Sequence, residues 1–148
     1  MRRFLLDTNI CLAFVRGHES YALIESELSL NRDDTVTLIS VVTKAELLSL
    51  GKQLRWSNKK LSKLNQLLEK LFIIDINNSD SELIEAYYTI DAYSQGKLTE
   101  KPLNDSARNM GKNDLWIAAT AFVARAELIT MDGDFDHLHN EFITVHKY

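Results

Sequence analysis

Residues 3–9, Arg-Phe-Leu-Leu-Asp-Thr-Asn, place a short apolar run directly before three small polar residues. An apolar run of this length is typical of a buried strand, and Asp, Thr and Asn are residues that commonly begin a helix. The stretch therefore predicts a strand over residues 3–6 that is followed by a helix. Asp7 would lie at the carboxyl end of this strand, which is where ligands gather in open parallel sheets.

The rest of the chain alternates between strand-like and helix-like segments. Short apolar runs, several of them rich in β-branched residues, predict further strands over residues 35–39, 72–76, 128–130 and 142–145. Helical spacing of apolar residues predicts helices over residues 10–16, 21–30, 42–53, 58–70, 79–94 and 114–126. Residues 95–113 lack either pattern and contain the only proline, so they predict a loop, which leaves room for a short helix over 104–110.

Strands that alternate with helices indicate an α/β protein whose sheet is mostly parallel. At 148 residues the chain has the length of one domain, and we expect residues 1–148 to form it around a sheet of four to five strands flanked by helices.

The composition, with 45% hydrophobic and 26% charged residues, is that of a soluble globular protein. Cys11 is the only cysteine, which excludes an internal disulfide and a cysteine metal site. The apolar run near the N-terminus ends at Asp7, too early for a signal peptide, and the longest uncharged stretches are about half of the ~20 residues that a membrane helix needs. We therefore expect a cytoplasmic protein with no membrane segment.

The net charge of −4 is unevenly distributed. Residues 44–70 contain seven basic and two acidic side chains, a local charge of +5, so the remainder of the chain has a charge of −9. Within this basic segment, Lys59, Lys60 and Lys63 are candidates for contacts with RNA or with an acidic partner. A helix face that is simply solvated remains the alternative.

Three other acidic residues resemble Asp7 in having a distinctive local setting. Glu46 lies at the edge of the apolar face of its predicted helix, Asp114 opens the helix 114–126, and Asp132 follows the strand 128–130. Each has an ordinary structural explanation, namely helix capping for Asp7, a boundary position for Glu46, a favourable helix dipole for Asp114 and a solvated turn for Asp132.

A site that brings these four acids together would require a cation, because like charges repel and burial removes their water. Oxygen ligands without a Cys or His cluster favour Mg²⁺ or Mn²⁺ over zinc. A calcium loop is excluded, since His137 occupies the position of its glycine and Ile143 that of its bidentate glutamate. We expect His137 and His139 to be structural.

This conjunction of acids resembles the PIN domain, a family of metal-dependent ribonucleases, and within it the small single-domain toxins of the VapC type. The resemblance is strongest over residues 4–12, 39–48 and 110–138. It implies a three-layer fold with a central parallel sheet between helices. It also implies catalytic, metal-ligand roles for Asp7, Glu46, Asp114 and Asp132.

The resemblance extends to polar residues beside these acids. Thr130 matches a hydroxyl before the last acid, and Ser40 matches one that leads into the Glu-bearing helix. Thr8 and Asn9 match the polar pair after the first aspartate. Asp134 also fits the family pattern, with a supporting role ranked below the four ligands.

The chemistry implied is hydrolysis of RNA phosphodiester bonds, assisted by one or two Mg²⁺ or Mn²⁺ ions. The partners implied are an RNA with single-stranded or loop regions, a second copy of the chain, and a cognate antitoxin that projects a basic side chain into the acidic pocket. Three alternatives stay open: an RNA-processing PIN nuclease without an antitoxin, a catalytically idle PIN-like scaffold that binds RNA or protein, and a metal-binding response-receiver-like module.

Overall fold

The computed structural model describes residues 1–148 and contains one sheet of five strands, all of them parallel, in the order β3-β2-β1-β4-β5. The central strand is β1 (Arg2–Leu6), which pairs with β2 (Thr35–Ser40) and β4 (Glu127–Thr130). The edge strands are β3 (Phe72–Ile74) and β5 (Val145–Lys147). The predicted parallel sheet is therefore confirmed.

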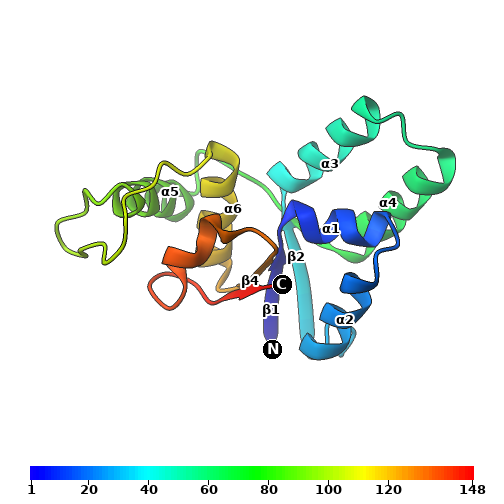
Figure 1. Cartoon of the computed structure of the whole chain (residues 1–148), viewed down its shortest axis with the longest axis horizontal. Coiled ribbons are helices and arrows are strands. Elements are labelled where there is room, and N and C mark those ends of the chain that lie inside the picture. The colour runs from blue at the N-terminus through cyan, green and yellow to red at the C-terminus, as the bar shows by residue number, and fades with distance from the viewer.

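Successive side chains of β1 enter two different cores, because neighbouring residues of a strand point to opposite faces. Phe4 and Leu6 belong to one buried cluster and Leu5 to the other. The first cluster is covered by α1 (Thr8–Val15), α2 (Glu19–Leu28), α3 (Val41–Gln53) and α4 (Asn58–Lys70), and the second by α5 (Ser81–Ser94) and α6 (Lys112–Ala124). Figure 1 shows these two groups of helices on either side of the strands. This is the expected three-layer fold.

Each strand and helix that was predicted has a counterpart in the structure, with ends that differ by up to three residues. Helix α6 begins at Lys112 with Gly111 as its N-cap, so Asp114 is the third residue of the helix and does not open it. Strand β5 occupies Val145–Lys147 and not residues 142–145, because Phe142 and Ile143 pack into the second core. Between β4 and β5 lies a 3₁₀ helix, η1 (Gly133–Leu138), that the sequence pattern did not predict.

Residues 95–111 form an extended connection from α5 to α6, which we call the strap. The predicted loop is confirmed, and no helix forms over 104–110. The backbone turns sharply at Gly96, whose φ of +71° is in the left-handed region that favours glycine. The strap returns to the body of the protein where the Arg108 N–H donates a 2.8 Å hydrogen bond to the Ser94 carbonyl and Met110 is buried. No helix of the structure is long and apolar enough to cross a membrane.

Candidate metal centre

The first and last of the predicted ligands lie at adjacent strand ends. Asp7 directly follows β1, and Asp132 comes two residues after the last residue of β4. These strands are paired, with Leu6 opposite Ile129, and the Asp7 N–H continues the ladder by donating to the Ile129 carbonyl at 2.9 Å. The parallel topology therefore places both aspartates at the carboxyl edge of the sheet, as the sequence predicted.

Three carboxylates converge most closely, and they include one that the sequence ranked below the others. Asp114, Asp132 and Asp134 each have an oxygen within 4.8 Å of the others. Asp114 projects from the first turn of α6, while Asp132 and Asp134 come from the start of η1. The Asp134 N–H donates to Oδ1 of Asp132 at 2.9 Å, which gives this turn a fixed shape. An oxygen of Asp134 therefore lies as near to Asp114 and Asp132 as a shared metal ion would require, although Asp134 was expected to have only a supporting role.

Asp7 is buried, and neighbouring donors hold both of its carboxylate oxygens. The Thr8 N–H donates to Oδ1 at 2.7 Å, and the Thr130 hydroxyl donates to Oδ2 at 2.6 Å. Asp7 is also the N-cap residue of α1, so the capping explanation of this residue is correct as well. Burial raises the pKa of Asp7, and the negative charges of Glu46 and Asp132 add to this effect, whereas the two hydrogen bonds oppose it.

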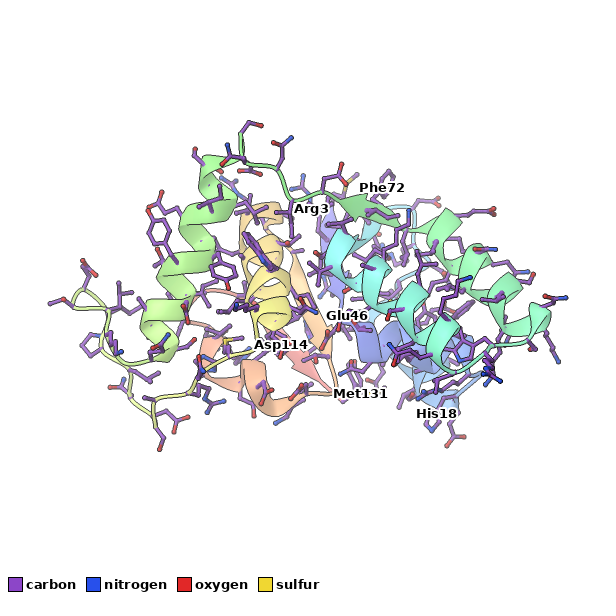
Figure 2. The ribbon with its side chains drawn as sticks, turned by 90° about the horizontal axis from the view of Figure 1, so that it is seen from above. Arg3, His18, Glu46, Phe72, Asp114 and Met131 are labelled. Carbon is purple, nitrogen blue, oxygen red and sulfur yellow. The ribbon has the colours of Figure 1, made fainter.

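Glu46 approaches the site from α3 and is held by a hydroxyl. The Thr8 side chain donates a 3.0 Å hydrogen bond to Oε1 of Glu46. Glu46 is half-buried and is near enough to both Asp7 and Asp114 for its charge to raise their pKa values. Figure 2 shows Glu46 and Asp114 close to each other in the middle of the molecule. The structure therefore brings all four predicted acids to one place, with Glu46 and Asp7 outside the tightest cluster.

The pKa of Asp114 is raised both by its burial and by the neighbouring acids. Burial, followed by the charges of Asp7, Asp132, Asp134 and Glu46, raises its pKa from 3.8 to about 7. A carboxyl group whose pKa is raised by burial and by four other acids is one that a divalent cation would relieve. The donor set consists of carboxylate oxygens alone, which suits Mg²⁺ or Mn²⁺.

The two nearby histidines are used in packing and hydrogen bonding. His137 is buried, its Nε2 lies 2.7 Å from the Ser94 hydroxyl, and its ring stacks against Tyr93. Burial and the charge of Arg108 lower its pKa, which favours the neutral ring. Nδ1 of His139 accepts a 2.9 Å hydrogen bond from the Val145 N–H. Both contacts agree with the structural role expected for these residues.

The predicted supporting residues fall into two groups. Thr8, Thr130 and Asn9 contact the site or its backbone, since the Asn9 side-chain oxygen accepts a 3.2 Å hydrogen bond from the Met131 N–H. Ser40 instead caps α3, where its hydroxyl accepts from the Val42 N–H at 3.2 Å. Ser40 therefore fixes the start of the helix that contains Glu46 and has no hydrogen bond to an acid of the site.

The lysines proposed as RNA contacts lie on a different part of the surface. All three belong to α4, where Lys59 and Lys60 are exposed and Lys63 is half-buried, with Nζ 5.9 Å from the ring centroid of Phe14. Figure 1 shows α4 on the side of the sheet opposite α6. These lysines therefore lie on the same side of the sheet as α3, which contains Glu46, whereas α6, which contains Asp114, lies on the other side.

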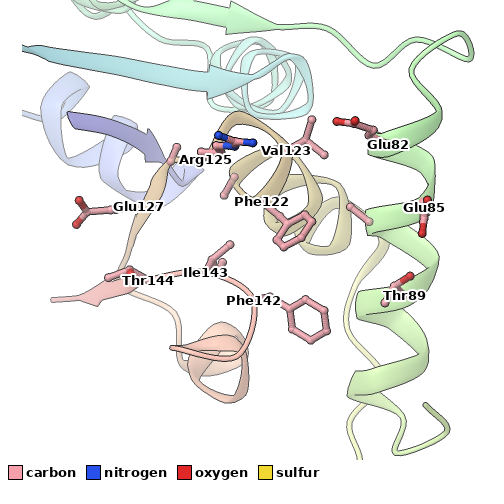
Figure 3. Close-up of a pocket in the computed structure, with 13 residues that line it drawn as sticks. Glu82, Glu85, Thr89, Phe122, Val123, Arg125, Glu127, Phe142, Ile143 and Thr144 are labelled. Carbon is pink, nitrogen blue, oxygen red and sulfur yellow. The ribbon is translucent and has the colours of Figure 1, made fainter. Parts of the chain in front are cut away.

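A large cavity is separate from the acids. A cavity of about 660 Å³ lies at the C-terminal end of α6, opposite the end that contains Asp114. Figure 3 shows Phe122 and Phe142 in the space between α6 and α5, with Arg125 and Glu82 at its border. None of the three clustered carboxylates, Asp114, Asp132 and Asp134, lines this cavity, so it is not the candidate metal centre.

Comparisons with known proteins agree with this fold. A chain of the VapBC2 structure from Rickettsia felis, bound to a DNA fragment from its promoter, is 25% identical and has a TM-score of 0.74, with 98% of each chain covered. A chain of VapBC-1 from nontypeable Haemophilus influenzae is 22% identical with a TM-score of 0.69, covering 98% of this chain and 97% of that one. A chain of VapBC-5 from Mycobacterium tuberculosis, described as a member of the VapBC family of toxin-antitoxin systems, is 22% identical with a TM-score of 0.60. The match covers 99% of this chain and 98% of that one.

No curated protein matches the chain. The family comparison is decisive, because the PIN domain family matches residues 4–140, which include every acid of the candidate metal centre. This chain belongs to the PIN domain family.

Proposed function

We propose that the protein is a divalent-metal-dependent endoribonuclease and the toxin of a type II toxin–antitoxin pair. The observation that supports this most strongly is the convergence of acids at the carboxyl edge of the sheet, from the starts of α1 and η1 and from the helices α3 and α6. There the pKa of Asp114 is raised to about 7. Membership of the PIN domain family and the likeness to the VapBC structures point to the same function.

In this proposal Asp114, Asp132 and Asp134 hold Mg²⁺ or Mn²⁺. The ion would lower the pKa of a water molecule and neutralise the negative charge that develops on the phosphate as RNA is hydrolysed. Asp7 and Glu46 complete the acidic lining, and the hydroxyls of Thr130 and Thr8 fix the orientations of their carboxylates. Carboxylates that are already oriented lose little freedom when the ion binds.

An antitoxin partner is proposed from the likeness to toxin–antitoxin complexes and from the surface of the helices α2 to α4. This region is rich in leucine. Part of that leucine is buried, but Leu23 and Leu54 are each 54% exposed, and Leu48 and Leu61 are also exposed. Exposed apolar side chains of this kind suit an amphipathic helix of a partner or a second copy of the chain. An arginine of the antitoxin would pair with the carboxylates of the metal centre.

The nuclease proposal is tested with purified protein and a labelled single-stranded RNA. Cleavage should require Mn²⁺ or Mg²⁺, stop with EDTA, and be lost in Asp114→Asn, whose side chain has the same shape but no charge. Arg32→Gln, which removes an exposed charge paired with Asp34, is the control and should cleave at the parental rate. Full cleavage by Asp114→Asn at saturating Mn²⁺ would contradict the assignment.

The toxin proposal needs a separate test in cells. Expression of the chain alone should arrest growth and yield a homodimer, and co-expression with the adjacent reading frame should yield an inactive complex. A harmless monomer with cleavage activity in vitro would favour the RNA-processing alternative. A protein that binds RNA but never cleaves it would favour the idle scaffold.

A further inference from the structure

We propose that Arg108 is a positioning residue that holds the turn between Asp132 and Asp134 in the shape required for metal binding. This inference rests on the proposed function, because it concerns the same metal centre. It assigns a role to the strap, the segment between α5 and α6 that Figure 1 shows extending away from the sheet and returning to the start of α6.

The guanidinium of Arg108 contacts the backbone between the two ligands. Nη1 donates a 3.3 Å hydrogen bond to the carbonyl oxygen of Gly133, the residue that separates Asp132 from Asp134. A shift of this peptide would move both carboxylates, since one precedes it and the other follows it. Arg108 therefore controls the geometry of two ligands through one backbone atom.

Arg108 is itself held from two directions. Its other terminal nitrogen, Nη2, donates to Oδ2 of Asp105 at 2.9 Å, and its backbone N–H donates to the Ser94 carbonyl at the end of α5. Ser94 is fully buried and its hydroxyl lies 3.3 Å from the sulfur of Met110. These contacts fix the returning part of the strap, so the guanidinium has a defined position.

The remainder of the turn has a different support. Nζ of Lys147, on β5, donates to Oδ2 of Asp136 at 2.6 Å. A side chain added at Gly133 would lie 3.5 Å from the same oxygen of Asp136 and 3.9 Å from Nζ of Lys147. Lys147 therefore supports the outer part of η1, and Arg108 is the side chain that donates to the peptide between the two ligands.

A simple electrostatic effect would have the opposite sign. A positive charge near the site repels a divalent cation, so removing it would tighten metal binding if charge alone mattered. A positioning role predicts weaker binding, because outer residues that orient metal ligands typically change metal affinity 10–100-fold when they are mutated. The direction of the change distinguishes the two explanations.

The test is the affinity of the EDTA-stripped full-length protein for Mn²⁺, measured by isothermal titration calorimetry. Arg108→Met should weaken binding by about 10–100-fold. Arg108→Lys should recover most of this loss, because its longer side chain can still donate a hydrogen bond to the Gly133 carbonyl. Lys101→Met is the matched control: Lys101 is also on the strap, but it pairs with Glu141 at 2.9 Å, and its loss should leave Mn²⁺ affinity unchanged.

Circular dichroism and thermal melting in EDTA identify variants that fail to fold. If Arg108→Met fails to fold, Arg108→Gln, whose amide is too short to reach the Gly133 carbonyl, replaces it and should weaken Mn²⁺ binding in the same way. Mn²⁺ binding by the folded loss variant that equals or exceeds that of the parent, or binding by Arg108→Lys no better than that of the loss variant, would overturn the positioning role. A parent protein that binds no Mn²⁺ would instead refute the metal centre and the proposed function.

Discussion

The hydroxyl of Thr130 connects two acids of the candidate metal centre, Asp7 and Asp132. It donates a 2.6 Å hydrogen bond to Oδ2 of Asp7, 123 residues away in sequence, and accepts a 3.0 Å hydrogen bond from the N–H of Asp132. Both Thr130 and Asp7 are buried. A single side chain at the end of β4 therefore sets the orientation of one carboxylate and the backbone position of another.

Thr130→Val should destabilise the protein, because it keeps the shape of the side chain but leaves a buried carboxylate and an N–H without this partner. The expected loss is about 1–3 kcal/mol in the free energy of unfolding at neutral pH, measured by urea denaturation. Thr130→Ser, which retains the hydroxyl, should lie much closer to the parent. Equal stability of Thr130→Val and the parent would show that the hydrogen bond contributes nothing.

Asp114→Asn should stabilise the metal-free protein. The pKa of Asp114 is 3.8 as a free side chain and about 7 in the folded protein, so the folded state retains a proton that the unfolded state loses. The stability of the parent in EDTA therefore falls as the pH rises from 3.8 towards about 7. Asparagine has no such proton, and the Tm difference in favour of Asp114→Asn should grow over this range and then level off. A difference that does not vary with pH would contradict the raised pKa.

Metal affinity should depend on pH through the same residue. Ligands must be deprotonated to bind a divalent ion, and Asp114 holds its proton up to a pH of about 7. Below that value the Mn²⁺ affinity should fall about tenfold for each pH unit, with release of about one proton per ion. Calorimetry in two buffers of different ionisation enthalpy measures this proton directly. A Mn²⁺ affinity that stays constant between about pH 5 and about pH 7 would show that Asp114 is already ionised over this range.

Replacing Lys59, Lys60 and Lys63 with glutamine should weaken RNA binding and flatten its dependence on salt. Each contact with a single-stranded phosphate that is lost lowers the slope of log K against log salt by about 0.7. A matched change at Arg32, Lys97 and Lys101, three basic residues outside the segment 44–70, should leave the slope close to that of the parent. A triple variant at 59, 60 and 63 with the parental slope would assign those lysines to a solvated helix face.

The strands and helices were predictable where side-chain pattern and burial agree. Residues 3–6 were expected to be a buried strand, and Phe4, Leu5 and Leu6 are fully buried in β1. A helix was expected over residues 58–70, and α4 has these bounds, with the Ser57 hydroxyl accepting from the Lys60 N–H at its start. The strap and η1 were not predictable in detail, because their conformation depends on contacts with distant residues and not on a local repeat.

The site was predictable in its residues but not in its arrangement. Asp7, Glu46, Asp114 and Asp132 meet at one edge of the sheet, as expected from their places at strand ends and on the adjoining helices. The sequence ranked Asp134 second, whereas its oxygen lies with those of Asp114 and Asp132. It gave no indication of Arg108, which lies in a segment without hydrophobic periodicity and contacts the site through a backbone carbonyl.

By itself, the sequence determined the α/β architecture and the acids at the ends of β1 and β4, because strand periodicity and the position of a residue at a strand end are local properties. Only the tertiary structure decided which carboxylates lie within 4.8 Å of one another, that Thr130 bridges Asp7 and Asp132, and that the strap places Arg108 on Gly133. Those relationships join residues far apart in the chain. Their distances depend on how α5, α6 and η1 pack against the sheet, which no local pattern of residues encodes.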